Sequence, residues 1–176
     1  MVRTRLQCVC WFSWEPAGGC SGNVHGFSGV ALRDLLPLQL LHQASLQVNT
    51  DLDALAPVLE WFNQFHAPPI SYEVWLHCQL ALAEGFTNAV RHAHCGLPLE
   101  TPITMEVQVF ATQLEMRIWD CGQPFDLQQA LESMPQDLDT EAEGGRGLRL
   151  MQRIADILTY CRTADDRNCL LIVKKY

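Results

Sequence analysis

The chain has 176 residues, of which 48% are hydrophobic, and its formal net charge is −8 at pH 7. This length and apolar content fit one domain with a sizeable core, whereas the acidic balance argues against a nucleic-acid surface, which needs clustered lysine and arginine. The sequence has no apolar run long enough to span a bilayer and no signal-peptide pattern at its start, so we expect a cytoplasmic protein that is not membrane-bound.

Residues 1–43 differ in character from the rest of the chain. A few aromatic residues precede a glycine- and serine-rich run and a leucine-rich segment broken by Pro37, without a period of 2 or 3.6. An irregular tail, a short helix that docks on a partner and sequence upstream of the true start all remain open. We therefore predict an irregular or disordered N-terminal extension over 1–43 and a folded domain over 44–176.

The eight cysteines do not predict disulfides or a metal centre. Those in the periodic part of the chain are expected to be reduced and to pack as small hydrophobic residues. Near the N-terminus Cys8, Cys10, Cys20 and His25 match no common zinc spacing, so we expect no zinc site there.

The first half of the domain alternates short and long periodic segments. A strand is predicted over 44–49, and a helix capped by Asp51 or Asp53 follows and ends before the two prolines at 68–69. A long helix is predicted over 71–94, with Ser71 as its N-cap.

The second half predicts a hairpin, a loop, a helix and two strands. The hairpin has alternating strands over 103–109 and 114–118, and a polar, acidic loop follows over 127–143. A helix over 147–157 then precedes strands at 158–163 and 169–174. The order of elements predicts an α+β fold, a two-layer sandwich of one mixed or antiparallel sheet with helices on one face.

One polar stripe lies within the long helix. Glu84, Asn88 and His92 recur every four residues and so share a face. Polar groups of this kind are costly to bury without partners, and taken alone the stripe favours a solvated helix face.

Two glycine-containing stretches downstream change this interpretation. IWDCGQPFD, residues 118–126, places Asp120 at the end of a strand before a glycine turn, and EGGRGLRLM, residues 143–151, places glycines before a helix. Glycines let a ligand approach the backbone, and the free N–H groups of a helix start attract phosphate. Arg146 adds a planar donor fork for phosphate oxygens. A single glycine loop is usually a turn, but these stretches in this order predict a ligand site.

The three stretches resemble the motifs of the GHKL ATPase superfamily. ExxxNAxxHA at 84–93 resembles its N box, DxGxxFD at 120–126 its first glycine box, and GGRGLxLM at 144–151 its second. In this form they are most similar to the RsbW-like anti-sigma-factor serine/threonine kinases, and the resemblance covers residues 44–176. It implies the Bergerat, or histidine-kinase-like ATPase, fold.

The resemblance implies a binding site for ATP and Mg²⁺. Glu84 would be the catalytic base, Asn88 the magnesium ligand, and Asp120 the acceptor for the adenine amino group. Gly122 would let the base lie close to the backbone. The phosphates would be held by the second glycine box, namely Gly144, Gly145, Arg146, Gly147 and Leu148.

Three further residues belong to these motifs. His92 is either a structural histidine or a ligand contact, and Phe125 is interpreted as core packing in preference to a base-stacking group. Asp126 is interpreted as the cap at the start of the 127–143 loop, which the resemblance makes a lid over the nucleotide.

Two function classes stay open. In the first, the protein phosphorylates a serine or threonine of an anti-anti-sigma (STAS-type) antagonist and otherwise sequesters a sigma factor, as a homodimer. In the second, it is an ATP-binding regulatory module without phosphotransfer. Glu84 favours the kinase, whereas the absence of the Gly-Thr pair that many relatives carry before the last strand, where this chain has Asn168 and Cys169, favours the module.

Overall fold

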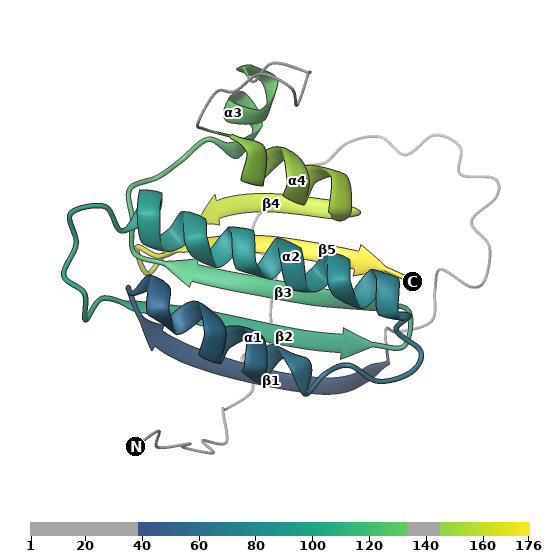
Figure 1. Cartoon of the computed structure of the whole chain (residues 1–176). Coiled ribbons are helices and arrows are strands. Elements are labelled where there is room, and N and C mark those ends of the chain that lie inside the picture. The colour runs from purple at the N-terminus through teal and green to yellow at the C-terminus, as the bar shows by residue number, and fades with distance from the viewer. Residues whose placement is uncertain (1–38, 134–144) are drawn as a thin grey trace. The chain divides into compact units, whose positions relative to one another are not determined.

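A computed structural model describes residues 39–133 and 145–176. Within them a five-stranded sheet has the order β1-β2-β3-β5-β4, and every neighbouring pair is antiparallel. The helices α1, α2 and α4 lie over the same face of this sheet (Figure 1). The α+β prediction is confirmed, and of the two sheet types left open the antiparallel one is found.

The strands are β1 (Leu40–Asn49), β2 (Pro102–Phe110), β3 (Gln113–Asp120), β4 (Ile157–Arg162) and β5 (Asn168–Lys175). The helices are the 3₁₀ turn η2 (Leu52–Ala54), α1 (Leu55–Asn63), α2 (Tyr72–Asn88), the π-helical turn η3 (Ala89–Ala93), α3 (Leu127–Ser133) and α4 (Arg146–Ile154). None of the helices in the described ranges is both long and apolar enough to cross a membrane.

The hairpin of β2 and β3 supplies the centre of the sheet. Its strands pair from Thr104 opposite Trp119 to Val109 opposite Leu114, and buried residues alternate with partly exposed ones along both. This alternation is what a sheet with one covered face requires. The predicted hairpin is therefore confirmed.

β1 begins at Leu40, ahead of the predicted start at residue 44. It continues because β2 extends to Phe110, and the backbone of Phe110 pairs with Leu40 across a bulge. Residues 40–43, which were predicted as part of the extension, thus belong to the sheet. The predictions for residues 1–38, including that for Cys8, Cys10, Cys20 and His25, lie outside the described residues.

Helix α2 packs along the sheet and carries the first motif. The Ser71 hydroxyl caps it by accepting a hydrogen bond from the Val74 N–H (3.3 Å). Its buried face joins α1 through Trp75, whose ring stacks on Phe62 with centroids 4.2 Å apart. Gly85 brings the helix close to β3, because a Cβ there would lie 2.5 Å from the Ile118 side chain.

The helix does not stay α-helical to its end. The His94 N–H donates to the carbonyl of Ala89, which is the five-residue spacing of a π turn. As a result His94 is buried, at 2% exposed, whereas His92 is exposed.

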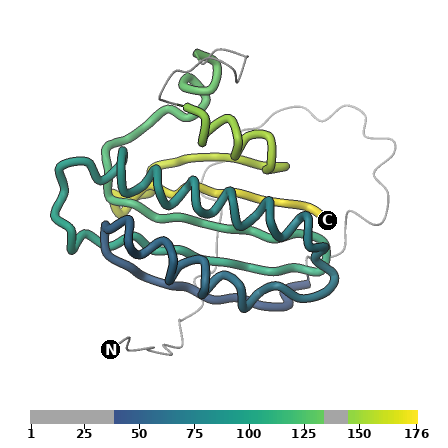
Figure 2. Tube along the Cα trace, viewed as in Figure 1, coloured from purple at the N-terminus to yellow at the C-terminus, as the bar shows by residue number. Residues whose placement is uncertain are grey.

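The segment after β3 differs from the predicted loop. Figure 2 traces the chain from the end of β3 to α3, and the Asp126 carboxylate caps α3 by accepting from the Gln129 N–H (2.9 Å). Residues 127–133 are therefore helical, and the prediction of a loop throughout 127–143 is wrong for this part. Residues 134–144 lie outside the described ranges.

Helix α4 ends at Ile154, earlier than the predicted 157. The chain is drawn into the sheet at Asp156, whose N–H donates to the Val173 carbonyl (2.8 Å) and whose carboxylate accepts from the Lys175 N–H (2.7 Å). The β4 and β5 strands follow close to their predicted positions.

Two leucines on α2 give a matched test of this packing. Leu82 is 0% exposed and Leu80 is 42% exposed. We expect Leu82→Ala to lower the free energy of unfolding by about 2–5 kcal/mol, because it leaves a cavity between helix and sheet. Leu80→Ala should cost under about 1 kcal/mol. Urea denaturation measures both, and equal losses would contradict this orientation of α2.

Candidate functional site

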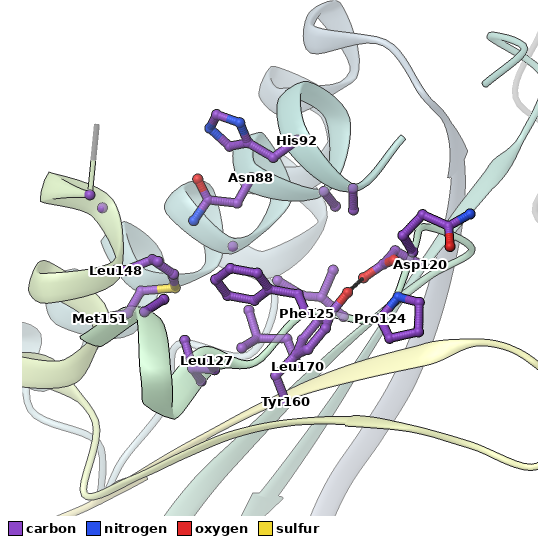
Figure 3. A pocket seen from close by; sticks show the side chains of 18 of the residues that line it. Asn88, His92, Asp120, Pro124, Phe125, Leu127, Leu148, Met151, Tyr160 and Leu170 are labelled. Atoms are coloured by element: carbon purple, nitrogen blue, oxygen red, sulfur yellow. Dashed lines mark hydrogen bonds between the residues drawn. The ribbon is translucent and has the colours of Figure 1, made fainter. Parts of the chain in front are cut away.

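A cavity of about 520 Å³ lies where the ends of α2 and β3 meet the start of α4 (Figure 3). This volume is in the usual range for small-molecule sites. It is lined by Gly85, Asn88, Ala89, His92, Ala93, Cys95, Ile118, Asp120, Gln123, Pro124, Phe125, Leu127, Ala130, Gly145, Gly147, Leu148, Met151, Tyr160 and Leu170. The lining thus includes residues from all three motif stretches.

Asp120 is the buried acid of the cavity, at 3% exposed. One carboxylate oxygen, Oδ1, accepts from the Gly122 N–H and from the Asn168 amide, both at 2.8 Å. The other, Oδ2, accepts from the Tyr160 hydroxyl, also at 2.8 Å. All of these partners are donors, which is what a buried carboxylate needs to offset the loss of water.

Asn168 is fully buried and holds this arrangement from β5, where it pairs directly opposite Asp120. Its amide group donates to Asp120 and to the Gly122 carbonyl (3.0 Å), and its oxygen accepts from Arg162 (3.2 Å). Both donors and the acceptor are used, so the amide orientation is defined by its partners. Asn168 therefore links the carboxylate to the glycine turn.

The glycine turn is held against the end of the motif helix. A Cβ at Gly122 would overlap the backbone carbonyl of Ala93, which cannot move away as a flexible side chain could. Arg162 donates to the Gly122 carbonyl (2.9 Å) from β4. Gly122 is thus required for close approach of two backbone segments, whereas its predicted approach to a base stays a prediction.

His94 joins the same turn to the first strand. Its Nε2 accepts from the Cys121 N–H (2.8 Å), and its Nδ1 lies 2.6 Å from the Thr50 hydroxyl, which donates to the Thr101 carbonyl (2.7 Å). These partners define a neutral imidazole with the proton on Nδ1. Burial lowers the pKa of His94, although the Asp120 charge opposes this.

At the other end of the cavity, Asn88 and Glu84 face the start of α4. Asn88 lines the cavity, and its Nδ2 is buried with no hydrogen-bond partner among the described residues. Glu84 is half-buried and is not among the lining residues. Its carboxylate lies against Gly147, where a Cβ would overlap it.

The second glycine box is divided between cavity and solvent. Gly145, Gly147 and Leu148 line the cavity, and Gly145 has a φ of 94°, a conformation that favours glycine. Arg146 is exposed and is not among the lining residues. Gly144 lies outside the described residues.

Aromatic and apolar side chains form the remaining wall. Phe125 is 47% exposed and makes an edge contact with Tyr160, with ring centroids 6.0 Å apart. The interpretation of Phe125 as a core residue is therefore wrong, because the chain leaves the sheet after Asp120 and carries Phe125 to the cavity surface. In Figure 3, Asp120 and Pro124 lie toward one end of the cavity, and Leu148 and Met151 toward the other.

The donor set fits a nucleotide with a hard cation. The described residues contain no group of three or more His, Cys, Asp or Glu side chains that could hold a metal ion by themselves. The unpaired Asn88 Nδ2 is a buried amide donor beside a glycine cradle, so it suits a phosphate oxygen. The other amide atom, Oδ1, is a neutral oxygen of the kind that suits a cation taking most of its ligands from phosphates and water. Asn88 is thus the residue that could hold Mg²⁺.

A family model described as the histidine kinase-like ATPase domain matches residues 48–174. Since this is most of the chain, the protein belongs to the histidine kinase-like ATPase family, which implies that the domain binds ATP. The family resemblance drawn from the three motifs is confirmed.

The individual relatives that match this chain are serine-protein kinases. The chain is 35% identical over 91 residues to the serine-protein kinase RsbW of Listeria monocytogenes, which covers 49% of this chain and 57% of the relative. It is 35% identical to RsbW of Bacillus pumilus, over 48% of this chain and 56% of the relative. It is 31% identical to RsbW of Bacillus licheniformis, over 49% of this chain and 56% of the relative. The chain spans little more than half the length of these curated relatives.

The motifs do not include His94, Tyr160 or Arg162, which complete the site. The sequence indicated Asn168 only because it stands where many relatives carry the Gly-Thr pair. The alternation in β4 is a signal for Tyr160, because it groups Tyr160 with half-buried Leu158. No comparable pattern marks His94, since its burial depends on the π turn.

His94 predicts a pH dependence of stability. Its folded pKa lies below the unfolded value near 6.5, so the unfolded state binds more protons as the pH falls through 6.5. Stability should then decrease toward acid, by at most about 1.4 kcal/mol per pH unit for one group, with no such loss above pH 7. Thermal melting from pH 7.5 to 5 measures it. His94→Gln should flatten this slope, whereas His92→Gln, at an exposed position, should leave it unchanged; equal slopes in all three proteins would refute the assignment.

Proposed function

We propose that this protein is an ATP-binding anti-sigma regulatory factor with serine/threonine kinase activity toward an anti-anti-sigma antagonist. The observation that supports this most is a single cavity with Asn88, Asp120 and Gly147 in its lining, one residue from each motif stretch. The similarity to RsbW serine-protein kinases supports the reaction type.

The adenine would be recognised at the Asp120 end. The Oδ2 atom of Asp120 has one protein donor, the Tyr160 hydroxyl, and can accept a second hydrogen from an exocyclic amino group. Guanine has a carbonyl at that position, which a carboxylate would repel. The site is thus expected to bind ATP in preference to GTP.

The phosphates would extend toward Asn88 and the start of α4. Gly145 and Gly147 keep the backbone open there, Leu148 lines the wall, and the free N–H groups of the helix start attract negative charge. Gly144 and Arg146 are proposed as additional phosphate contacts. Asn88 would hold Mg²⁺, which would supply charge compensation for the phosphate oxygens.

Glu84 is proposed as the general base. A serine or threonine hydroxyl that attacks the γ-phosphate must lose its proton, and the Glu84 carboxylate, beside Gly147 at the phosphate end, would accept it. The phosphoryl group then bonds to the substrate oxygen and ADP leaves. Gly147 keeps room for the carboxylate, since a side chain there would displace it.

An ATP-binding regulatory module without phosphotransfer is the second candidate. It is favoured by the position of Glu84, which is not among the residues that line the cavity. In either case the proposed partners are a sigma factor and a STAS-type antagonist, with the protein acting as a cytoplasmic homodimer.

Asp120→Asn tests the nucleotide site. In either orientation the new amide would point its N–H groups at other donors, namely the Gly122 N–H and Asn168 on one side or Tyr160 and the ligand amino group on the other. ATP affinity should therefore fall by roughly 1.5–3 kcal/mol, or about ten- to a hundredfold. Titration calorimetry with Mg-ATP measures it. Asp126→Asn is a matched control, because asparagine also caps helices and Asp126 does not line the cavity. Unchanged affinity in Asp120→Asn would remove this residue from the site.

Glu84→Gln separates the two candidates. If the protein is a kinase, this variant should bind Mg-ATP normally yet transfer phosphate about 10²–10⁴ times more slowly. The assay is radiolabel transfer from ATP to a panel of STAS-type proteins, with Glu73→Gln, at an exposed position of the same helix, as control. Wild-type protein that binds ATP but labels no antagonist would leave the regulatory module as the function.

A further inference from the structure

Tyr160 is a polar side chain of the cavity that lies outside all three motifs. It lies on β4, half-buried, with its ring in edge contact with Phe125 and its hydroxyl 2.8 Å from Asp120 Oδ2. Both Tyr160 and Asp120 line the cavity, so their two oxygens form a pair at its wall (Figure 3).

The two oxygens of Asp120 have different capacity for a ligand. Oδ1 accepts from the Gly122 N–H and the Asn168 amide, which use its two lone-pair directions. Oδ2 accepts only from Tyr160 among the described residues. The acceptor that remains for a ligand therefore lies beside the Tyr160 hydroxyl.

The Tyr160 hydroxyl has one hydrogen, which it can donate to a ligand instead of to Asp120. Burial and the hydrogen bond to Asp120 raise the pKa of this hydroxyl, so it keeps its proton. A hydroxyl hydrogen rotates to suit its partners, and it can turn from Oδ2 toward a ligand acceptor while the ligand amino group replaces it on Oδ2. The oxygen pair thus offers one acceptor and one donor side by side.

We propose that Tyr160 is a specificity-determining residue that recognises the ring nitrogen N1 of adenine, while Asp120 accepts from the neighbouring amino group. Adenine presents a donor and an acceptor at these adjacent positions, which matches the pair. Guanine presents a carbonyl and an N–H, which reverses both. A buried polar pair left mismatched strongly disfavours the wrong ligand.

The orientation of this pair is defined from β5 and from the turn after β3. Asn168 and Gly122 hold Oδ1, which leaves Oδ2 as the oxygen toward Tyr160. Arg162 on β4 donates to the Asn168 oxygen and so fixes the Asn168 amide. Asn168, which stands where many relatives carry the Gly-Thr pair, therefore influences the ligand through Asp120. Tyr160 contacts the base directly, whereas Asn168 is a positioning residue.

This inference rests on the proposed ATP binding, and nucleotide analogues test it separately. In 1-deaza-ATP a C–H replaces N1 and the amino group is kept, whereas 7-deaza-ATP keeps both. Wild-type protein should bind 1-deaza-ATP about three- to tenfold more weakly than ATP, the worth of one hydrogen bond between neutral groups. It should bind 7-deaza-ATP without the loss of affinity seen for 1-deaza-ATP, because N1 is still present. Titration calorimetry measures each affinity.

Tyr160→Phe removes only the hydroxyl and should abolish the difference between ATP and 1-deaza-ATP. Tyr72→Phe, at an exposed position of α2, should keep it. If Tyr160 were merely structural, the variant would bind both nucleotides less well but with the wild-type ratio, which would overturn the inference. Equal wild-type affinity for ATP and 1-deaza-ATP would overturn it without any variant. If the wild type bound no ATP at all, the proposed function would fail with it.

Discussion

The site depends on the cost of burying one charge. Asp120 is nearly inaccessible to water, and it is tolerated there because donors come to it from three parts of the chain: the Gly122 backbone, the Asn168 amide and the Tyr160 hydroxyl. Two of them are on β5 and β4, so the carboxylate is satisfied only when these strands are in their native register. The sheet therefore assembles the site.

A second constraint ties the motif helix to the same point. Ala93, at the end of η3, packs on Gly122 without room for a side chain, and His94 accepts from the Cys121 N–H. The π turn makes this possible, because it turns His94 inward. The end of the motif helix and the glycine turn are therefore held together by direct contacts.

The two ends of the cavity differ in how their polar groups are used. Around Asp120 most hydrogen-bonding capacity is taken up by the protein, which favours a preorganised, selective site. Toward α4, Asn88 Nδ2 has no partner in the described part of the chain, and the N-cap residue Gly145 supplies no side-chain cap. These are N–H donors that phosphates are proposed to engage, whereas a cation would bind the Asn88 oxygen.

Local patterns in the sequence were enough for the α+β class, for most of the elements and for the three motif stretches, but not for helix α3 or for the choice between a mixed and an antiparallel sheet. Alternation identified the hairpin, and the glycines after Asp120 and before α4 predicted backbone that must approach something closely. For Gly122 the structure adds a close neighbour that the sequence did not indicate, the backbone of Ala93. Only the tertiary structure decided which residues meet: the pairing of Asp120 with Asn168, the burial of His94 and the contact of Tyr160 all join positions far apart in sequence. Strand register and the π turn set these contacts, and both depend on packing that no local window of residues contains.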